Sequence, residues 1–325
     1  MRLRALRDIR FWLIGGALAA VLATIFVPRV ALERHVYDAL AVLDITSSMN
    51  TRDLSEAGSP DSRLDAAKAA LRAMLANLPC QSRMGLAIFT ERQTFLLFSP
   101  VEVCGNFAAL DDAIDELSWR MGWEGSSYVA KGLYSAIDTA KSLGADLVFF
   151  TDGHEAPPLP FSGLPPFVAK PGEVGGLIVG VGGHGKAPLT KYDEEGREAG
   201  IYGAQDLPQE NRAGPPPPDA TSRPGYHPKW APFGNAVVNN NEHVAYIREE
   251  HLKELARITG LAYVYLRPGE NLVPALAEAV RPRPATVDSD VRQYPAGLAL
   301  VLLVVLYGLL PLAGARRTRS LPSNP

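Results

Sequence analysis

The chain has 325 residues, a formal net charge of -3 and 47% hydrophobic residues. That length suffices for one sizeable core with additions, or for two small domains. The nearly balanced charge argues against nucleic acid as a partner, because surfaces that bind nucleic acid need a marked excess of Lys and Arg.

The first apolar block, Phe11–Val27, has about the minimum length of a membrane span. We expect a transmembrane helix over residues 11–28, after a basic cytoplasmic tail at residues 1–10. A cleaved signal peptide is the alternative, but Val27-Pro28-Arg29 follows the block where a small-x-small cleavage motif would be expected. The basic residues of the tail are Arg2, Arg4, Arg7 and Arg10.

The next part of the chain alternates between two kinds of pattern. Short apolar runs predict buried strands, and apolar residues at helical spacing predict helices. The expected strands cover residues 37–44, 84–89, 94–98, 146–151, 175–181 and 261–266, and the helices 61–78, 107–117, 127–143 and 243–259. This order predicts an α/β fold with a doubly wound, mostly parallel sheet, helices on both faces and one antiparallel hairpin strand.

Two segments interrupt this alternation. Residues 157–171 are rich in proline, and residues 184–242 contain four consecutive prolines at 215–218 and three asparagines at 239–241. Such a composition cannot bury a core of its own. We interpret residues 184–242 as a surface insertion in one domain spanning residues 36–280. An arm that binds a partner and a tolerated loop both remain open.

The second apolar block, Ala296–Gly314, predicts another transmembrane helix over residues 295–314. It follows a linker at residues 281–294 and precedes a tail at 315–325. Basic residues next to a span tend to stay cytoplasmic, so both ends are expected inside and residues 29–294 outside. Arg316, Arg317 and Arg319 support this orientation, whereas Arg281, Arg283 and Arg292 weaken it.

Cys80 and Cys104 flank the predicted hairpin. In an antiparallel pair the start of the first strand neighbours the end of the second, so the two sulfurs can meet. An exported domain lies in an oxidising compartment, which favours a disulfide over the alternative of two separate buried thiols. Such a bond would contribute about 3 kcal/mol.

Three oxygen-bearing side chains follow the first predicted strand. Asp44, Thr46 and Ser48 alternate along one loop. Ligands of open α/β sheets gather at the carboxyl ends of strands. Carboxylate and hydroxyl oxygens are the ligands that Mg²⁺ and Ca²⁺ prefer, so this loop is a candidate cation site.

Two later motifs complete a pattern. Ser127 lies in Gly125-Ser126-Ser127 before a predicted helix, and Asp152 lies in Thr151-Asp152-Gly153 after a predicted strand. Together with the loop at Asp44, these motifs resemble the metal-ion-dependent adhesion site of von Willebrand factor A (VWA) domains. The family motif has Ser at position 46 and Thr at position 127, so two hydroxyl residues are exchanged here. Ser126 is the alternative alignment for Ser127.

The resemblance implies a VWA fold whose cation, Mg²⁺ or Ca²⁺, is held by the five aligned side chains. The cation keeps a position open for a carboxylate of a partner protein, so the implied function is docking and not catalysis. The same fold with an inactive site is the alternative. The implied ligands are Asp44, Thr46, Ser48, Ser127 and Asp152.

A narrower resemblance is to the MxaL family. It is carried by residues 44–50, 78–80, 85–91, 100–104, 119–121 and 130–134, and by the layout of two spans. This resemblance implies an inner-membrane protein with its VWA domain in the periplasm. It also implies a role in maturing a pyrroloquinoline quinone-dependent methanol dehydrogenase and supplying its Ca²⁺. Other VWA proteins and a MoxR-type AAA+ ATPase are the implied partners. A general envelope VWA protein of the aerotolerance (Bat-like) kind, also working with such an ATPase, is the alternative.

A hydrolase is the remaining hypothesis, with Ser48, His154 and Asp152 as its catalytic residues. The chain lacks the Gly-x-Ser-x-Gly turn that presents a nucleophilic serine, and Ser48 belongs to the cation motif. We therefore expect no enzyme activity.

Overall fold

The computed structural model describes residues 8–26, 29–54, 62–122, 126–159, 163–203, 206, 218–224, 226 and 242–311. The chain divides into two units, Met1–Arg34 with Pro284–Pro325, and His35–Arg283. Several features of the sequence lie outside the described residues: Arg2, Arg4, Arg7, Gly125, the prolines at 215–217, the asparagines at 239–241, the last residues of the second predicted span and the tail at 315–325.

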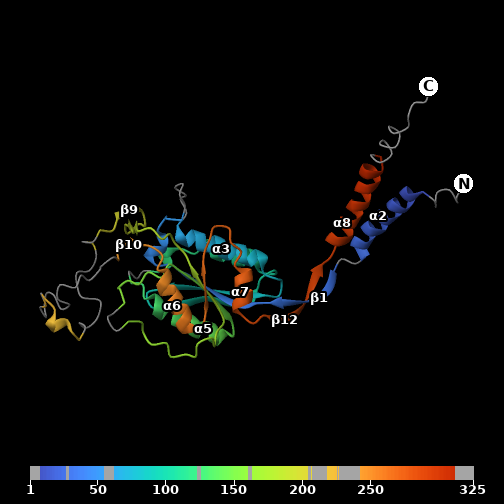
Figure 1. Cartoon of the computed structure of the whole chain (residues 1–325). Coiled ribbons are helices and arrows are strands. Elements are labelled where there is room, and N and C mark those ends of the chain that lie inside the picture. The colour runs from blue at the N-terminus through green and yellow to red at the C-terminus, as the bar shows by residue number, and fades with distance from the viewer. Residues whose placement is uncertain are drawn as a thin grey trace, which may run out of the picture. The chain divides into compact units, whose positions relative to one another are not determined.

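A six-stranded sheet, flanked by the helices labelled α3, α5, α6 and α7 in Figure 1, organises the unit His35–Arg283. Its strand order is β11-β6-β5-β2-β3-β4. Neighbouring strands are parallel except β3 and β4, which form the expected hairpin. The mostly parallel α/β sheet is therefore confirmed. Its strands are β2 (Asp38–Asp44), β3 (Arg83–Thr90), β4 (Gln93–Glu102), β5 (Asp146–Thr151), β6 (Gly176–Gly180) and β11 (Ala262–Tyr265).

Helices cover both faces of this sheet, because alternate strand residues feed two separate apolar clusters. Leu43 and Phe150 pack in one cluster with residues of α3, α4 and α7, while Val42 and Phe149 pack in the other with α5 and α6. The helices are α3 (Arg63–Asn77), α4 (Phe107–Asp115), α5 (Val129–Leu143), α6 (Glu249–Thr259) and α7 (Val273–Ala279).

The insertion at residues 184–242 carries short strands that the sequence analysis does not assign. β8 (Thr190–Tyr192) pairs with β9 (Glu198–Ile201) in an antiparallel ladder. β7 (Ala187–Pro188) pairs with β10 (Val244–Ala245), which lies just beyond the insertion's end. The insertion is thus tied at its base and contains a small hairpin of its own.

Two further strands lie where the sequence analysis places a linker or no element. β1 (Arg29–Val36) and β12 (Arg283–Asp290) form a two-stranded sheet. Residues 281–294 are therefore partly strand. Their pairing joins segments from opposite ends of the chain, which a local pattern cannot reveal.

The unit Met1–Arg34 with Pro284–Pro325 contains two apolar helices that pack against each other, α2 (Ile9–Phe26) and α8 (Gln293–Val304). α8 continues into a π-helical turn, η5 (Val305–Leu309). Among the described residues, α2 alone has the length and apolar composition needed to cross a membrane, and Gln293–Leu309 is a shorter apolar helix. A second transmembrane helix stays a prediction.

Candidate metal centre

The candidate ligands Asp44 and Asp152 lie at the carboxyl edge of the sheet. Asp44 is the last residue of β2, and Asp152 directly follows β5. β2 and β5 are parallel neighbours, which brings the two carboxylates to adjacent strand ends. Both side chains are completely buried.

Asp44 is held by hydroxyl and amide donors. Its Oδ1 accepts hydrogen bonds from the backbone N of Thr46 at 2.9 Å and from the Thr46 hydroxyl at 2.7 Å. Its Oδ2 accepts one from the hydroxyl of Thr151 at 2.6 Å. The Thr46 hydroxyl also lies 3.4 Å from that of Ser48, in the 3-10 turn η1 (Ser47–Asn50). Three of the candidate ligands therefore form one buried polar cluster.

Asp152 forms an ion pair with a residue that the sequence analysis does not single out. Its Oδ2 accepts a hydrogen bond from the guanidinium of Arg63, whose side chain is fully buried. Arg63 also pairs with Asp53, and the same Asp53 carboxylate accepts the backbone N–H of Gly183 at 3.0 Å. The carboxylate of Asp152 is thus already paired with the positively charged guanidinium of Arg63.

Arg63 was detectable in principle. It lies on the buried face of α3, in line with Ala67 and Ala70 at helical spacing. A charged residue on an apolar helix face signals a buried ion pair, because an unpaired buried charge is very costly.

The main chain of Ser127 is hydrogen-bonded to the segment that follows β5. Its backbone N donates to the carbonyl of Ala156 at 2.6 Å, and Ala156 N donates back at 2.8 Å. Its hydroxyl is buried and has no hydrogen-bond partner in the part of the chain that the structure describes. No hydrogen bond joins Ser127 to the other four candidate ligands within those residues.

Asp44 has no ion-pair partner among the described residues, whereas Asp152 is already paired with Arg63. Burial, and next to it the negative charge of Asp152, raise the pKa of the Asp44 carboxyl to about 7. Two buried carboxylates, two buried hydroxyls beside Asp44 and one buried hydroxyl without a partner are all oxygen ligands of the hard type. These donors fit a divalent cation such as Mg²⁺ or Ca²⁺.

His154 lies two residues beyond Asp152 and is almost completely buried. Burial lowers the pKa of its imidazole to about 4. Its backbone N–H donates to Asp152 Oδ1 at 2.9 Å, and its ring has a contact with the backbone of Glu242 but no well-formed hydrogen bond among the described residues. The imidazole therefore makes no hydrogen bond to Ser48 or to the Asp152 carboxylate, as a catalytic relay would require.

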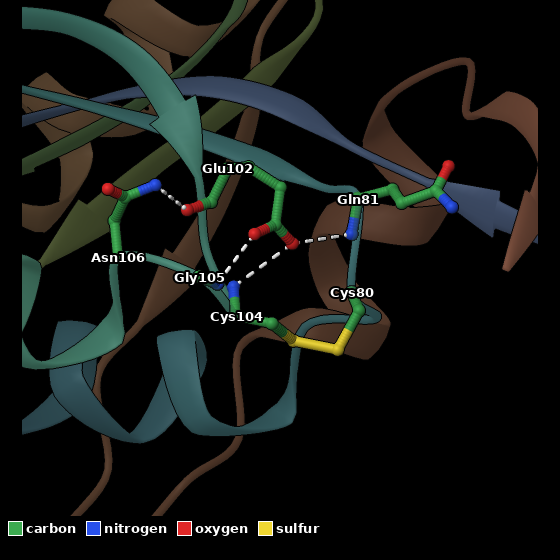
Figure 2. Close-up of a disulfide and its surroundings, with 6 residues drawn as sticks. All are labelled: Cys80, Gln81, Glu102, Cys104, Gly105 and Asn106. Atoms are coloured by element: carbon green, nitrogen blue, oxygen red, sulfur yellow. Dashed lines mark hydrogen bonds between the residues drawn. A yellow bond between two sulfur atoms is a disulfide. The ribbon is translucent and has the colours of Figure 1, made fainter. Parts of the chain in front are cut away.

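Cys80 and Cys104 form a disulfide (Figure 2). They lie just before β3 and just after the antiparallel β4, at the opposite edge of the sheet from Asp44. Glu102 lies beside it and accepts backbone N–H groups of Gln81, Cys104 and Gly105. Burial alone would raise the pKa of Glu102, but these three donors hold it below its usual value. The sulfurs and Glu102 lie close enough for a metal site, yet sulfurs bonded to each other are not thiolate ligands.

A search of curated proteins finds no match for this chain. Among solved structures, one match is an aerotolerance-related membrane protein from Bacteroides fragilis NCTC 9343 with multiple mutations to serines. It shares 14% sequence identity with this chain, and the TM-score is 0.46. The match covers 75% of this chain and 98% of that one. The conserved hypothetical protein BatB from Bacteroides thetaiotaomicron also shares 14% identity, with 82% and 98% covered and a TM-score of 0.44.

One family profile, the von Willebrand factor type A domain, matches residues 39–154. That range includes all five candidate ligands and the strands β2 and β5 that position the two aspartates. The chain therefore contains a von Willebrand factor type A domain.

Proposed function

We propose that the VWA domain binds a divalent cation and uses it to dock a carboxylate of a partner protein, without catalysing a reaction. The ligands would be Asp44, Thr46, Ser48, Ser127 and Asp152. The observation that carries the proposal is the buried pair Asp44 and Asp152, with Asp44 already disfavoured as a free anion. A bound cation would supply Lewis acidity and a position for a carboxylate from outside.

The cation site is tested by titrating the purified protein with MgCl₂, CaCl₂ and MnCl₂ in a calorimeter after removal of metal with EDTA. We expect binding to the original chain, and loss of binding in Asp44→Ala. Asp138→Ala is the matched control, because Asp138 is exposed on α5 and has no assigned role. Equal heats in all three proteins, or no heat in any of them, would contradict the proposal.

We further propose that the protein is anchored in the inner membrane of a bacterium with the VWA domain in the periplasm. Three features support this location. α2 is apolar and long enough to span, basic residues precede it, and the disulfide between Cys80 and Cys104 suits an oxidising compartment. In its general form, the function is that of an envelope VWA protein, with other VWA proteins and a MoxR-type AAA+ ATPase as partners.

A narrower candidate client is a periplasmic methanol dehydrogenase that requires Ca²⁺. Its support is the resemblance of residues 44–50 and 100–104, with their flanking motifs, to the MxaL family. The test is deletion of the gene in its host, followed by measurement of the Ca²⁺ content and activity of the purified dehydrogenase. Rescue by the original gene but not by Asp44→Ala would support this client. Normal Ca²⁺ and activity after deletion would leave only the general envelope function.

A further inference from the structure

A pocket of about 340 Å³ begins directly beside the candidate ligand Asp152. Its wall combines the segment after β5 with the segment that leads into α6, and we call it the Arg248 pocket. The two segments are joined by a hydrogen bond from Arg248 N to the carbonyl of Asp152 at 2.8 Å. Its polar lining consists of His154, Glu155, Glu242, Tyr246, Arg248 and His251.

Arg248 brings an unpaired positive charge to this pocket. Its guanidinium stacks on the ring of Tyr246, 3.5 Å from the centroid, and forms no ion pair or side-chain hydrogen bond within the described residues. It is partly buried, which lowers its pKa, and it is attracted by the carboxylate of Asp152 and repelled by the buried Arg63. Stacking occupies one face of the guanidinium and leaves its N–H edge for a ligand.

His154 is a second polar group with hydrogen-bonding capacity to spare among the described residues. It lines the pocket and is only 2% exposed, and its ring has a polar contact with the backbone of Glu242 but no well-formed hydrogen bond in the described part of the chain. A buried polar group of this kind is costly unless something bonds to it. A ligand in the pocket would satisfy it.

The acids of the pocket wall are already engaged. Glu155 accepts the backbone N–H groups of Val129 and Ala130 at 3.0 and 2.9 Å, and it lies 3.1 Å from the ring nitrogen of His251. Glu242 also has an interaction within the chain. The guanidinium of Arg248 is therefore the charged donor of the lining that has no salt bridge among the described residues, and a carboxylate is the group that such a donor binds best.

We propose that the Arg248 pocket binds a carboxylate of the partner protein, so that the partner presents a pair of acidic residues. One acid goes to the cation at Asp44 and Asp152, and the other goes to Arg248 and His154. This inference rests on the proposed docking function and adds that the partner's recognition element is a diacid.

The probes are capped peptides with two glutamates separated by zero, one or two glycines, and matching peptides in which the second glutamate is glutamine. Dissociation constants are measured by ligand-observed NMR on the full chain in detergent, with Mg²⁺. We expect at least one diacid to bind about tenfold more tightly than its single-acid partner, which is the worth of one charge-assisted hydrogen bond. Arg248→Gln should abolish this preference and leave the single-acid constant unchanged.

Two variants act as controls. Arg248→Lys keeps the charge and should retain part of the preference, while Arg257→Gln alters an exposed arginine of the same helix and should retain all of it. If Arg248→Gln does not fold, Arg248→Lys and the comparison of the peptides on the original chain still decide the question.

The outcomes separate this inference from the function on which it rests. Binding that needs Mg²⁺ and Asp44 but is equal for both kinds of peptide would overturn the diacid proposal and keep the docking function. Binding that depends on neither Mg²⁺ nor Asp44 would overturn the docking function. Inorganic phosphate that binds through Arg248, with no preference for the diacid, would make the pocket a phosphate site and overturn the carboxylate assignment.

Discussion

At the scale of single residues, Asp44 combines complete burial with a neighbouring negative charge. Its pKa is raised to about 7 in the folded protein, compared with 3.8 for an unperturbed Asp. Between these values the unfolded chain releases the proton while the folded chain keeps it. The folded state then binds more protons, so the stability of the cation-free protein should fall as the pH rises from 4 to 7, and level off above that.

This pH dependence is measured by thermal unfolding in EDTA for the original chain and for Asp44→Asn. The melting temperature of the original chain, relative to that of the variant, should drop between pH 5 and pH 7. Added Mg²⁺ should raise the melting temperature of the original chain more at pH 7.5 than at pH 5.5, because the cation binds the ionised carboxylate. If the difference in melting temperature between the two proteins did not change with pH, the raised pKa of Asp44 would be excluded.

Arg63 should be a second sensitive residue. Arg63→Met leaves the buried Asp152 and the nearly buried Asp53 without their shared cation, and breaking a buried ion pair from one side costs about 3–5 kcal/mol. Arg72→Met is the control on the same helix, because Arg72 is substantially exposed and solvent-exposed ion pairs contribute little to stability. Urea unfolding compares the two variants, and equal losses would contradict the structural role of Arg63.

The placement of Asp44, Thr46, Ser48 and Asp152 at one edge of the sheet could be predicted from the sequence. Each follows an apolar run, and parallel strands bring their carboxyl ends together. The partners of Arg63 could not be predicted, because Asp53 and Asp152 are 10 and 89 residues away from it in the sequence. No local pattern encodes such a pairing.

At the scale of helices and strands, α5 lies unusually close to β3 at Gly132. A Cβ added there would lie 2.0 Å from the ring of Phe89, so even alanine requires the buried Phe89 ring or the helix to move. Overpacking of this kind costs about 1–3 kcal/mol, and we expect Gly132→Ala to reach the upper end. Asp138→Ala on the exposed face of α5 should change the free energy of unfolding little. A stable Gly132→Ala protein would mean that α5 and β3 separate easily.

The disulfide joins the turn before β3 to the turn after β4, and its cysteines have a sequence separation of 24. Its removal by Cys80→Ser with Cys104→Ser should cost about 3 kcal/mol in urea unfolding. Cation affinity should not change, since the bond lies at the opposite edge of the sheet from Asp44. A large loss of Mg²⁺ affinity in the double variant would show that the two edges are coupled.

Most helices and strands of the VWA domain follow patterns that can be read locally, whereas β1, β10, β12 and α7 do not. The predicted helix over 243–259 begins only at Glu249, because β10 occupies Val244–Ala245. α7 has seven residues and a proline near its start, too few for a helical period to stand out. β1 and β12 pair with each other from opposite ends of the chain. Their strand structure depends on a partner that the sequence alone does not identify.

At the scale of the whole molecule, the two units have contrasting surfaces. In α2, Trp12, Ile25 and Phe26 are 62%, 67% and 79% exposed, which is unfavourable in water and suits a lipid environment. The unit His35–Arg283 instead has two well-buried apolar clusters and contains every candidate ligand of the cation site and the whole Arg248 pocket. The proposed membrane attachment and the proposed cation binding would therefore belong to different parts of the chain.

This separation predicts that a fragment of residues 35–283 folds by itself. It should be soluble without detergent, unfold in a single cooperative transition, and bind Mg²⁺ with the affinity of the full chain, because no proposed ligand lies outside it. The full chain should instead sediment with membranes and need detergent for extraction. Gel filtration, thermal unfolding and calorimetric titration of the two proteins provide the test. A fragment that aggregates, or that folds but binds Mg²⁺ much more weakly, would mean that the VWA domain depends on the helices α2 and α8 for its stability or its site.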